Sequence, residues 1–213
     1  MPENLIAPLR FGVVQSNLYR GSYPKNHNKR FLQRLGLKTI VSVTPEPLDE
    51  DMAEFCKSEG IQMVYIQCAG ADSKSKKKRG VPVPYSAATK AVEYMIDADL
   101  APMYIHCLNG AQVTCLLVAC LRKLSFWSMS AIMDEYLRHS DMEAAEQMFV
   151  EQFRAEINVP ASVVPWAWQG LSKGGVVRNH PTLKLKKKDA NDNSAEESKH
   201  VNDLDNNKTD IKS

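Results

Sequence analysis

The sequence predicts an α/β protein in which a central, mostly parallel sheet is flanked by helices. Three segments of largely apolar residues, 38–43, 61–66 and 103–106, have the length and composition of buried strands. Helical patterns of apolar residues lie between them along the chain. Because strands that alternate with helices usually pair in parallel and are covered on both faces, this order predicts the fold class.

The remaining elements follow from local patterns. Residues 11–24 predict a hairpin or two short strands, with Gly21 and Pro24 as turn residues. Apolar residues recur at helical spacing in five further segments, and a glycine closes each of the first two. These predicted helices cover residues 31–35, 48–56, 88–96, 129–137 and 145–153.

The chain divides into one folded domain and a polar tail. Its 213 residues are enough for a single hydrophobic core. We assign residues 1–170 to the folded domain, with segment 160–168 packed on its surface as an irregular strap. Residues 171–213 are predicted to be a disordered polar tail, because from Pro181 onward the chain becomes rich in Lys, Asp, Asn and Ser.

Charge and cysteine content narrow the function classes. The formal net charge is +2, which gives no basis for nucleic-acid or membrane binding. No signal peptide opens the sequence, and no apolar run reaches the length of a membrane span. The five cysteines lack the close-spaced pairs of zinc sites, so we expect free thiols in a reducing cytoplasm, with neither metal nor cofactor. The basic run at 184–188 leaves nuclear entry open, although such runs are usually just solvated.

The stretch 102–123 predicts the functional site. It contains a short strand that ends at Cys107, a tight loop at Gly110 and an apolar helix over 115–121. The first N–H groups of a helix have no internal partners, and the helix dipole favours negative charge there. A cysteine at such a place favours the thiolate form, which is the nucleophile. We expect Cys107 to attack phosphorus while the loop amides hold the phosphoryl oxygens; these belong to Leu108, Asn109, Gly110, Ala111, Gln112 and Val113.

The same residues also have structural explanations. Free cysteine is common in protein cores, so Cys107 alone is compatible with a buried strand end. Gly110 fits a close backbone approach or a positive φ under either explanation. Thr114 is either a hydrogen-bond donor to the Cys107 sulfur or a helix N-terminal cap. His106 is expected to orient the loop through a buried hydrogen bond.

A family resemblance supports the catalytic explanation. The motif His106-Cys107-x-x-Gly110-x-x-Val113-Thr114 resembles the signature of cysteine-dependent phosphatases, His-Cys-x-x-Gly-x-x-Arg followed by Ser or Thr. LYRGSYP at 18–24, FLQRLGLKTIVSVTPEP at 31–47 and CLRKLSFWSMSAIMDEYLRHS at 120–140 are similar to the plant and fungal atypical dual-specificity phosphatases, which include the yeast oxidant-induced cell-cycle-arrest proteins. The resemblance, over residues 8–155, implies the fold of those phosphatases and a phosphocysteine intermediate on Cys107.

Three positions depart from what the resemblance implies. The family has arginine at the position of Val113, where it binds two phosphoryl oxygens and stabilises the charge of the transition state. Active members usually carry lysine at the position of Ala111. An aspartate that helps to supply the general acid is expected where Tyr85 stands, and a tyrosine hydroxyl holds its proton too tightly for that role at neutral pH. We therefore expect activity to be weak or absent.

A basic loop at 73–79 precedes these residues. Its charged members are either a solvated loop or a cationic rim that attracts a polyanionic ligand to the pocket. Asp72 is the carboxylate near this loop, and it is a weak candidate to replace the general acid. The residues of the possible rim are Lys76, Lys77, Lys78 and Arg79.

Two functions from different classes follow. The first is a cysteine phosphatase whose substrates, by resemblance, are phosphotyrosine proteins or inositol pyrophosphates. The second is a catalytically dead pseudophosphatase that binds polyphosphate ligands or related phosphatase-like partners, since yeast members of the family associate with one another. A rhodanese-like sulfur carrier also uses a cysteine loop at a strand end, but the stretches at 18–24 and 44–47 argue against it.

Overall fold

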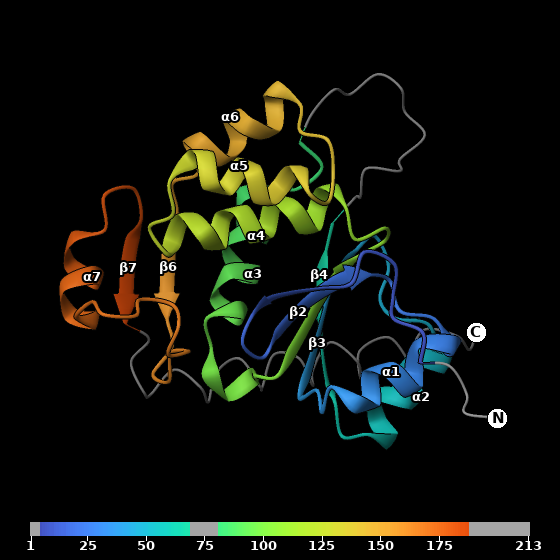
Figure 1. Cartoon of the computed structure of the whole chain (residues 1–213). Coiled ribbons are helices and arrows are strands. Elements are labelled where there is room, and N and C mark those ends of the chain that lie inside the picture. Colours follow the sequence, from blue (N-terminus) through green and yellow to red (C-terminus); the bar gives the residue numbers. More distant parts are fainter. Residues whose placement is uncertain (1–4, 69–80, 188–213) are drawn as a thin grey trace, which may run out of the picture.

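A five-stranded sheet forms the centre of the computed structural model, which describes residues 5–68 and 81–187 (Figure 1). The strand order is β1-β2-β5-β3-β4. β1 and β2 form the predicted antiparallel hairpin, and the other neighbours pair in parallel. The predicted α/β fold with a mostly parallel sheet is therefore confirmed. The strands are β1 (Gly12–Gln15), β2 (Leu18–Ser22), β3 (Thr39–Thr44), β4 (Gln62–Gln67) and β5 (Met103–Cys107).

Helices cover both faces of this sheet (Figure 1). α1 and α2 lie on one face, and α3 and α4 lie on the other, with α5 and α6 packed further out. All the predicted helices are present, and the helix that follows the Cys107 loop begins at residue 112 rather than 115. Their bounds are α1 (Lys29–Arg34), α2 (Glu50–Ser58), α3 (Tyr85–Met95), α4 (Gln112–Leu124), α5 (Met129–Leu137) and α6 (Ala144–Gln152), with 3-10 turns at Asn26–Asn28 and Ala98–Leu100.

Strand alternation divides the core into two parts. Successive side chains of a strand point to opposite faces of the sheet. Ile40 and Tyr104 accordingly join the smaller cluster beneath α1 and α2. Val41 and Ile105, one position along each strand, join the larger cluster beneath α3 and α4. β3 is buried along its whole length, because it lies between β5 and β4 and is covered on both faces.

The expectation of disorder from residue 171 onward was wrong for residues 171–187. Here α7 (Lys173–Asn179) and β7 (Lys184–Lys187) form an ordered unit in which β7 pairs in parallel with β6 (Glu156–Val159). Val176 and Leu185 are buried, so a few apolar residues suffice where they dock on an existing domain. The predicted disorder of residues 188–213 lies outside the described part of the chain.

The strap that precedes this unit packs on the domain as predicted. Trp168 is buried, and its indole N–H donates a 3.1 Å hydrogen bond to the carbonyl of Leu124. The indole of Trp166 donates a bond of the same length to the carbonyl of Ser16. Within the described residues, no helix combines the length and the apolar character that a membrane crossing needs.

Candidate anion site at the Cys107 loop

Cys107 is the last residue of β5, at the carboxyl edge of the parallel sheet. It pairs in register with Ser22 of β2, and the preceding His106 pairs with Ser42 of β3. The loop 108–111 then leads directly into α4. Ligands of open α/β sheets bind at this edge, so the fold places the cysteine where the sequence predicted a site.

Three successive carbonyl groups of the loop accept hydrogen bonds from residues outside the loop. The N–H of Tyr23 donates to the Leu108 carbonyl at 3.2 Å. Arg10 Nη1 donates to the Asn109 carbonyl at 3.0 Å, and Arg20 Nη2 donates to the Gly110 carbonyl at 3.0 Å. These peptide bonds are trans, so the N–H of each unit points away from its carbonyl. The N–H groups of residues 109, 110 and 111 are therefore turned to the inner side of the loop.

This arrangement makes a concave set of donors. Among residues 5–68 and 81–187, no acceptor bonds to the N–H groups of Asn109 and Gly110, while the N–H of Ala111 bonds to the Asn109 side chain at 3.0 Å. Successive inward N–H groups form an anion-binding nest, and the start of a 13-residue helix adds its dipole. The geometry suits a group with several anionic oxygens.

Gly110 is required by the packing of the loop against β2. Its φ is +70°, in the left-handed region that favours glycine. A Cβ atom on Gly110 would lie 2.6 Å from the carbonyl carbon of Gly21 and 2.6 Å from the nitrogen of Ser22. Both the close approach and the positive φ that the sequence left as alternatives are therefore present.

The sulfur of Cys107 lies within this loop and has two close polar neighbours. Thr114 Oγ1 donates a 3.0 Å hydrogen bond to it, and the sulfur lies 3.6 Å from Asn109 Oδ1. A hydroxyl donor at this distance stabilises a thiolate more than a thiol. Thr114 is buried in the first turn of α4, so the bond follows from the helix beginning at residue 112.

His106 is buried beneath the loop and bonded on both ring nitrogens. Its Nε2 lies 2.8 Å from Ser42 Oγ, and its Nδ1 lies 3.3 Å from the Cys107 carbonyl. Burial lowers the pKa of His106 to about 4, although the bond to the Cys107 carbonyl opposes this shift. The ring is therefore neutral at pH 7, with both nitrogens in buried hydrogen bonds.

The side chains of the loop itself provide no cation. Val113 is 3% exposed and packs in the larger hydrophobic cluster. Gln112 donates its side-chain amide to Glu146 of α6, away from the loop. Leu108 is exposed and Ala111 is buried, and neither carries a charge. The two arginines that contact the loop bind its carbonyl groups.

The contacts of the Tyr85 hydroxyl do not suit a general acid. Its hydroxyl donates a 3.2 Å hydrogen bond to the Phe149 carbonyl. Its ring stacks on the Phe149 ring, with 4.3 Å between the ring centroids. Burial raises the pKa of this hydroxyl above its ordinary value of 10.0. The predicted cationic rim, Lys76–Arg79, and Asp72 lie outside the described residues.

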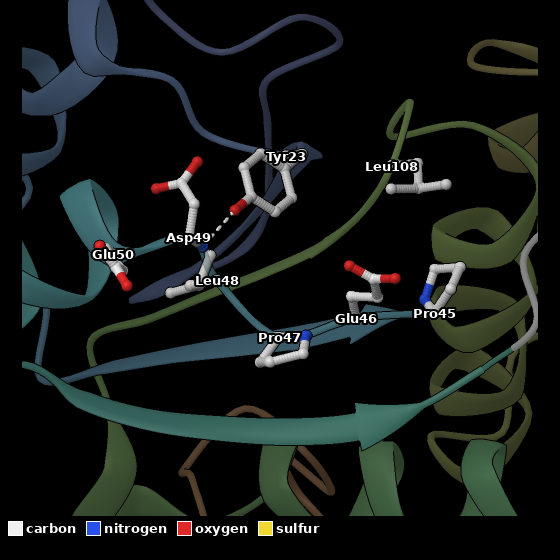
Figure 2. Close-up of a pocket in the computed structure, with 8 residues that line it drawn as sticks. All are labelled: Tyr23, Pro45, Glu46, Pro47, Leu48, Asp49, Glu50 and Leu108. Atoms are coloured by element: carbon white, nitrogen blue, oxygen red, sulfur yellow. Dashed lines mark hydrogen bonds between the residues drawn. The ribbon is translucent and has the colours of Figure 1, made fainter.

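A pocket of about 520 Å³ opens beside the loop (Figure 2). Leu108, Tyr23 and residues 45–50, which connect β3 to the start of α2, line this pocket. Tyr23 accepts a 2.7 Å bond at its hydroxyl from the Asp49 N–H, which fixes that segment. Figure 2 shows the Glu46 carboxylate pointing into the space between Tyr23 and Leu108. Three carboxylates line this pocket, those of Glu46, Asp49 and Glu50.

Sequence reasoning missed or underrated three supports of the loop. The sequence marks Arg20 only as a charged residue in a short strand, and Ser42 only as a polar residue within the apolar segment TIVSVT. Arg10 gave no signal, because it reaches Asn109 across 99 positions of sequence. Among the described residues, no group of three or more His, Cys, Asp or Glu side chains is arranged to hold a metal ion.

Comparison with known proteins relates this geometry to a family. Residues 5–172 match the family model described as the tyrosine phosphatase family. The Saccharomyces cerevisiae protein OCA6 is 41% identical over 76% of this chain and 79% of its own length. The inositol diphosphatase SIW14 of the same yeast is 34% identical over 71% of this chain and 53% of its own length.

Solved structures give the same result. The crystal structure of the core catalytic domain of SIW14, a PP-IP phosphatase, in complex with citrate superposes with a TM-score of 0.63. The two chains are 33% identical, and the match covers 70% of this chain and 88% of that one. The predicted cysteine-dependent phosphatase fold is thereby confirmed.

Proposed function

Because the chain belongs to the tyrosine phosphatase family, we propose that it binds a phosphorylated ligand at the Cys107 loop and turns it over slowly or not at all. The observation that carries this proposal is the outward bonding of three successive loop carbonyls, which turns three N–H groups inward beside the Cys107 sulfur. Such a nest binds oxyanions without any charged side chain in the loop.

The chemistry available to the loop is that of a cysteine phosphatase. The Cys107 thiolate would attack phosphorus, the bond from phosphorus to the leaving oxygen would break, and a phosphocysteine would form. Water would then release inorganic phosphate and return the thiolate. The Thr114 hydroxyl supports the thiolate, and the loop amides stabilise the charge on the phosphoryl oxygens.

Two groups that would speed the reaction are missing from the part of the chain that the structure describes: an arginine in the loop and a proton donor for the leaving oxygen. Val113 is packed in the core and offers no donor where the family has arginine. Loss of an arginine from a phosphoryl-transfer site costs ~10³–10⁵ in rate. The Tyr85 hydroxyl is bonded to Phe149 and holds its proton strongly, so the leaving oxygen lacks an obvious proton donor among the described residues.

The relatives suggest the class of ligand. SIW14 and its plant counterparts, such as DSP4 of Arabidopsis thaliana, carry the name inositol diphosphatase. We propose inositol pyrophosphates as the ligand class. As a second function of the same fold, we propose association with related phosphatase-like proteins. The carboxylates of the neighbouring pocket disfavour a polyanion that extends towards Glu46, so we expect such a ligand to extend to another side of the loop.

The test is phosphate release by the purified full chain, measured on an aryl phosphate and on an inositol pyrophosphate beside the SIW14 catalytic core. We expect turnover at least about 10³-fold below that core, and binding of inositol hexakisphosphate by calorimetry. Val113→Arg alone should leave turnover low if the missing acid also limits the rate. Turnover close to that of SIW14, lost in Cys107→Ser, would overturn the proposed inactivity. Failure to bind any phosphate would overturn the proposed binding.

A further inference from the structure

The side chain of Asn109 lies inside the Cys107 loop. Its Oδ1 accepts a 3.0 Å hydrogen bond from the N–H of Ala111 and lies 3.6 Å from the Cys107 sulfur, which donates to it as a thiol. The main-chain carbonyl of the same residue points outward and is held by Arg10 at 3.0 Å. Asn109 is therefore fixed at both its main chain and its side chain, with an oxygen on the inner side of the loop.

That oxygen has the neighbours that a phosphoryl oxygen would have. The N–H of Ala111 is one of the three donors that the outward carbonyls turn into the nest. In a nucleophilic attack the phosphorus lies about 3–3.5 Å from the sulfur, and its oxygens lie against the inward N–H groups. An oxygen that bonds to the Ala111 N–H and lies beside Cys107 therefore occupies one ligand position.

We propose that Asn109 is an internal occupant of the anion site and thereby lowers the affinity of the loop for every anion that enters it. The inference rests on the proposed function of the loop. An entering anion must displace the amide oxygen, so an ion bound by the loop alone, such as inorganic phosphate, competes poorly. A ligand that also contacts the protein outside the loop displaces the amide at the same local cost but with additional binding energy. Asn109 thus lowers the affinity for both kinds of ligand by the same factor, and a ligand with contacts outside the loop still binds at concentrations where simple phosphate does not.

The displaced contact sets the size of the effect. The hydrogen bond between neutral amide groups is of the kind worth roughly a three- to tenfold change in an equilibrium constant. Asn109→Ala should tighten the binding of inorganic phosphate by about this factor, because the Ala111 N–H becomes free. Asn109→Asp is isosteric and places a negative charge beside the sulfur, so it should weaken phosphate binding at least about tenfold.

One assay measures both binding and access to the thiol. The full chain is alkylated with iodoacetamide at pH 7.5, with and without inorganic phosphate, and Cys107 modification is followed by peptide mass spectrometry. Protection by phosphate gives its dissociation constant, and the rate without phosphate reports how freely the sulfur is reached. The matched control is Asn26→Ala, which removes an amide bonded to Asp51 on the surface. The control should leave both quantities unchanged.

The outcomes separate this inference from the proposed function. If Asn109 merely shapes the loop, Asn109→Ala weakens phosphate binding instead of tightening it, and the inference is overturned. If phosphate protects no variant, the proposed function fails. Cys107 alkylation without phosphate then still decides the inference, since Asn109→Ala must react faster than the unchanged chain. If Asn109→Ala does not fold, the isosteric Asn109→Asp is tested instead. Its Cys107 should react more slowly with the negatively charged reagent iodoacetate than Cys107 of the unchanged chain.

Discussion

The guanidinium of Arg20 donates a 3.0 Å hydrogen bond to the carbonyl of Gly110 from beneath the Cys107 loop. The same Nη2 atom lies 3.0 Å from the sulfur of Cys115, and the side chain is almost completely buried. Among the described residues, no carboxylate forms an ion pair with it. A buried cation without a carboxylate is costly unless its bonds are well made. Arg20 therefore fixes the peptide of Gly110 and adds positive charge below the anion site.

Replacing Arg20 with lysine should show whether Arg20 supports phosphate binding in addition to the stability of the fold. We expect Arg20→Lys to weaken phosphate binding roughly tenfold, equivalent to 1.4 kcal/mol, and to lower the free energy of unfolding by about 2 kcal/mol. Arg122→Lys is the matched control, because Arg122 is equally buried but bonds to Glu135 and to the Val14 carbonyl. The control should lose stability and keep phosphate affinity. Equal affinity losses in both variants would contradict the prediction.

Gly110→Ala should be much more destabilising than the same replacement at Gly60, a glycine of similar φ. Gly60 has a φ of +68° and open space where its Cβ would lie, so Gly60→Ala reports the backbone strain alone. We expect a loss of about 1 kcal/mol there. Gly110→Ala adds a clash with the backbone of Gly21 and Ser22, and the loss should reach about 3 kcal/mol or more. Denaturant unfolding measures both values, and equal losses would show that the loop can shift away from β2.

The buried His106 should make stability depend on pH. Its folded pKa of about 4 lies below the ordinary value of 6.5, so between these values the unfolded chain binds the proton more readily. Stability should therefore be complete above pH 6.5 and fall by about 3 kcal/mol as the pH drops to 4. His106→Gln keeps a side-chain group that can bond to Ser42 and cannot titrate, so the difference between the two unfolding curves isolates this contribution. A difference that stays constant from pH 4 to 7 would disprove the assignment.

The carboxylate of Glu46 should oppose the binding of polyanions. Glu46→Lys reverses one charge in the pocket beside Leu108 and should tighten the binding of inositol hexakisphosphate about three- to tenfold at low ionic strength. The gain should shrink as salt screens the interaction. Glu54→Lys makes the same charge change at an exposed position of α2 and serves as the control. Equal gains in both variants would attribute the effect to net charge rather than to the pocket.

Sequence reasoning succeeded where the relevant contacts are local or periodic. The buried strands, the helices and the cysteine loop are encoded by apolar spacing and by the single stretch around Cys107 and Gly110. It failed for residues 171–187, because the docking of α7 and β7 depends on Val176 and Leu185 meeting a surface built by distant parts of the chain. Composition alone does not reveal such a surface.

The sequence by itself determined the fold class, the family and the absence of a charged side chain from residues 108–113. The tertiary structure alone decided how the loop is oriented. Arg10, Arg20 and Tyr23 hold its carbonyls from positions 85 to 99 residues away in sequence, and Asn109 turns its own side chain inward. Hydrogen-bond direction depends on where the partners lie in space, and no sequence spacing encodes contacts that arise only when β2 and the N-terminal segment pack against the end of β5.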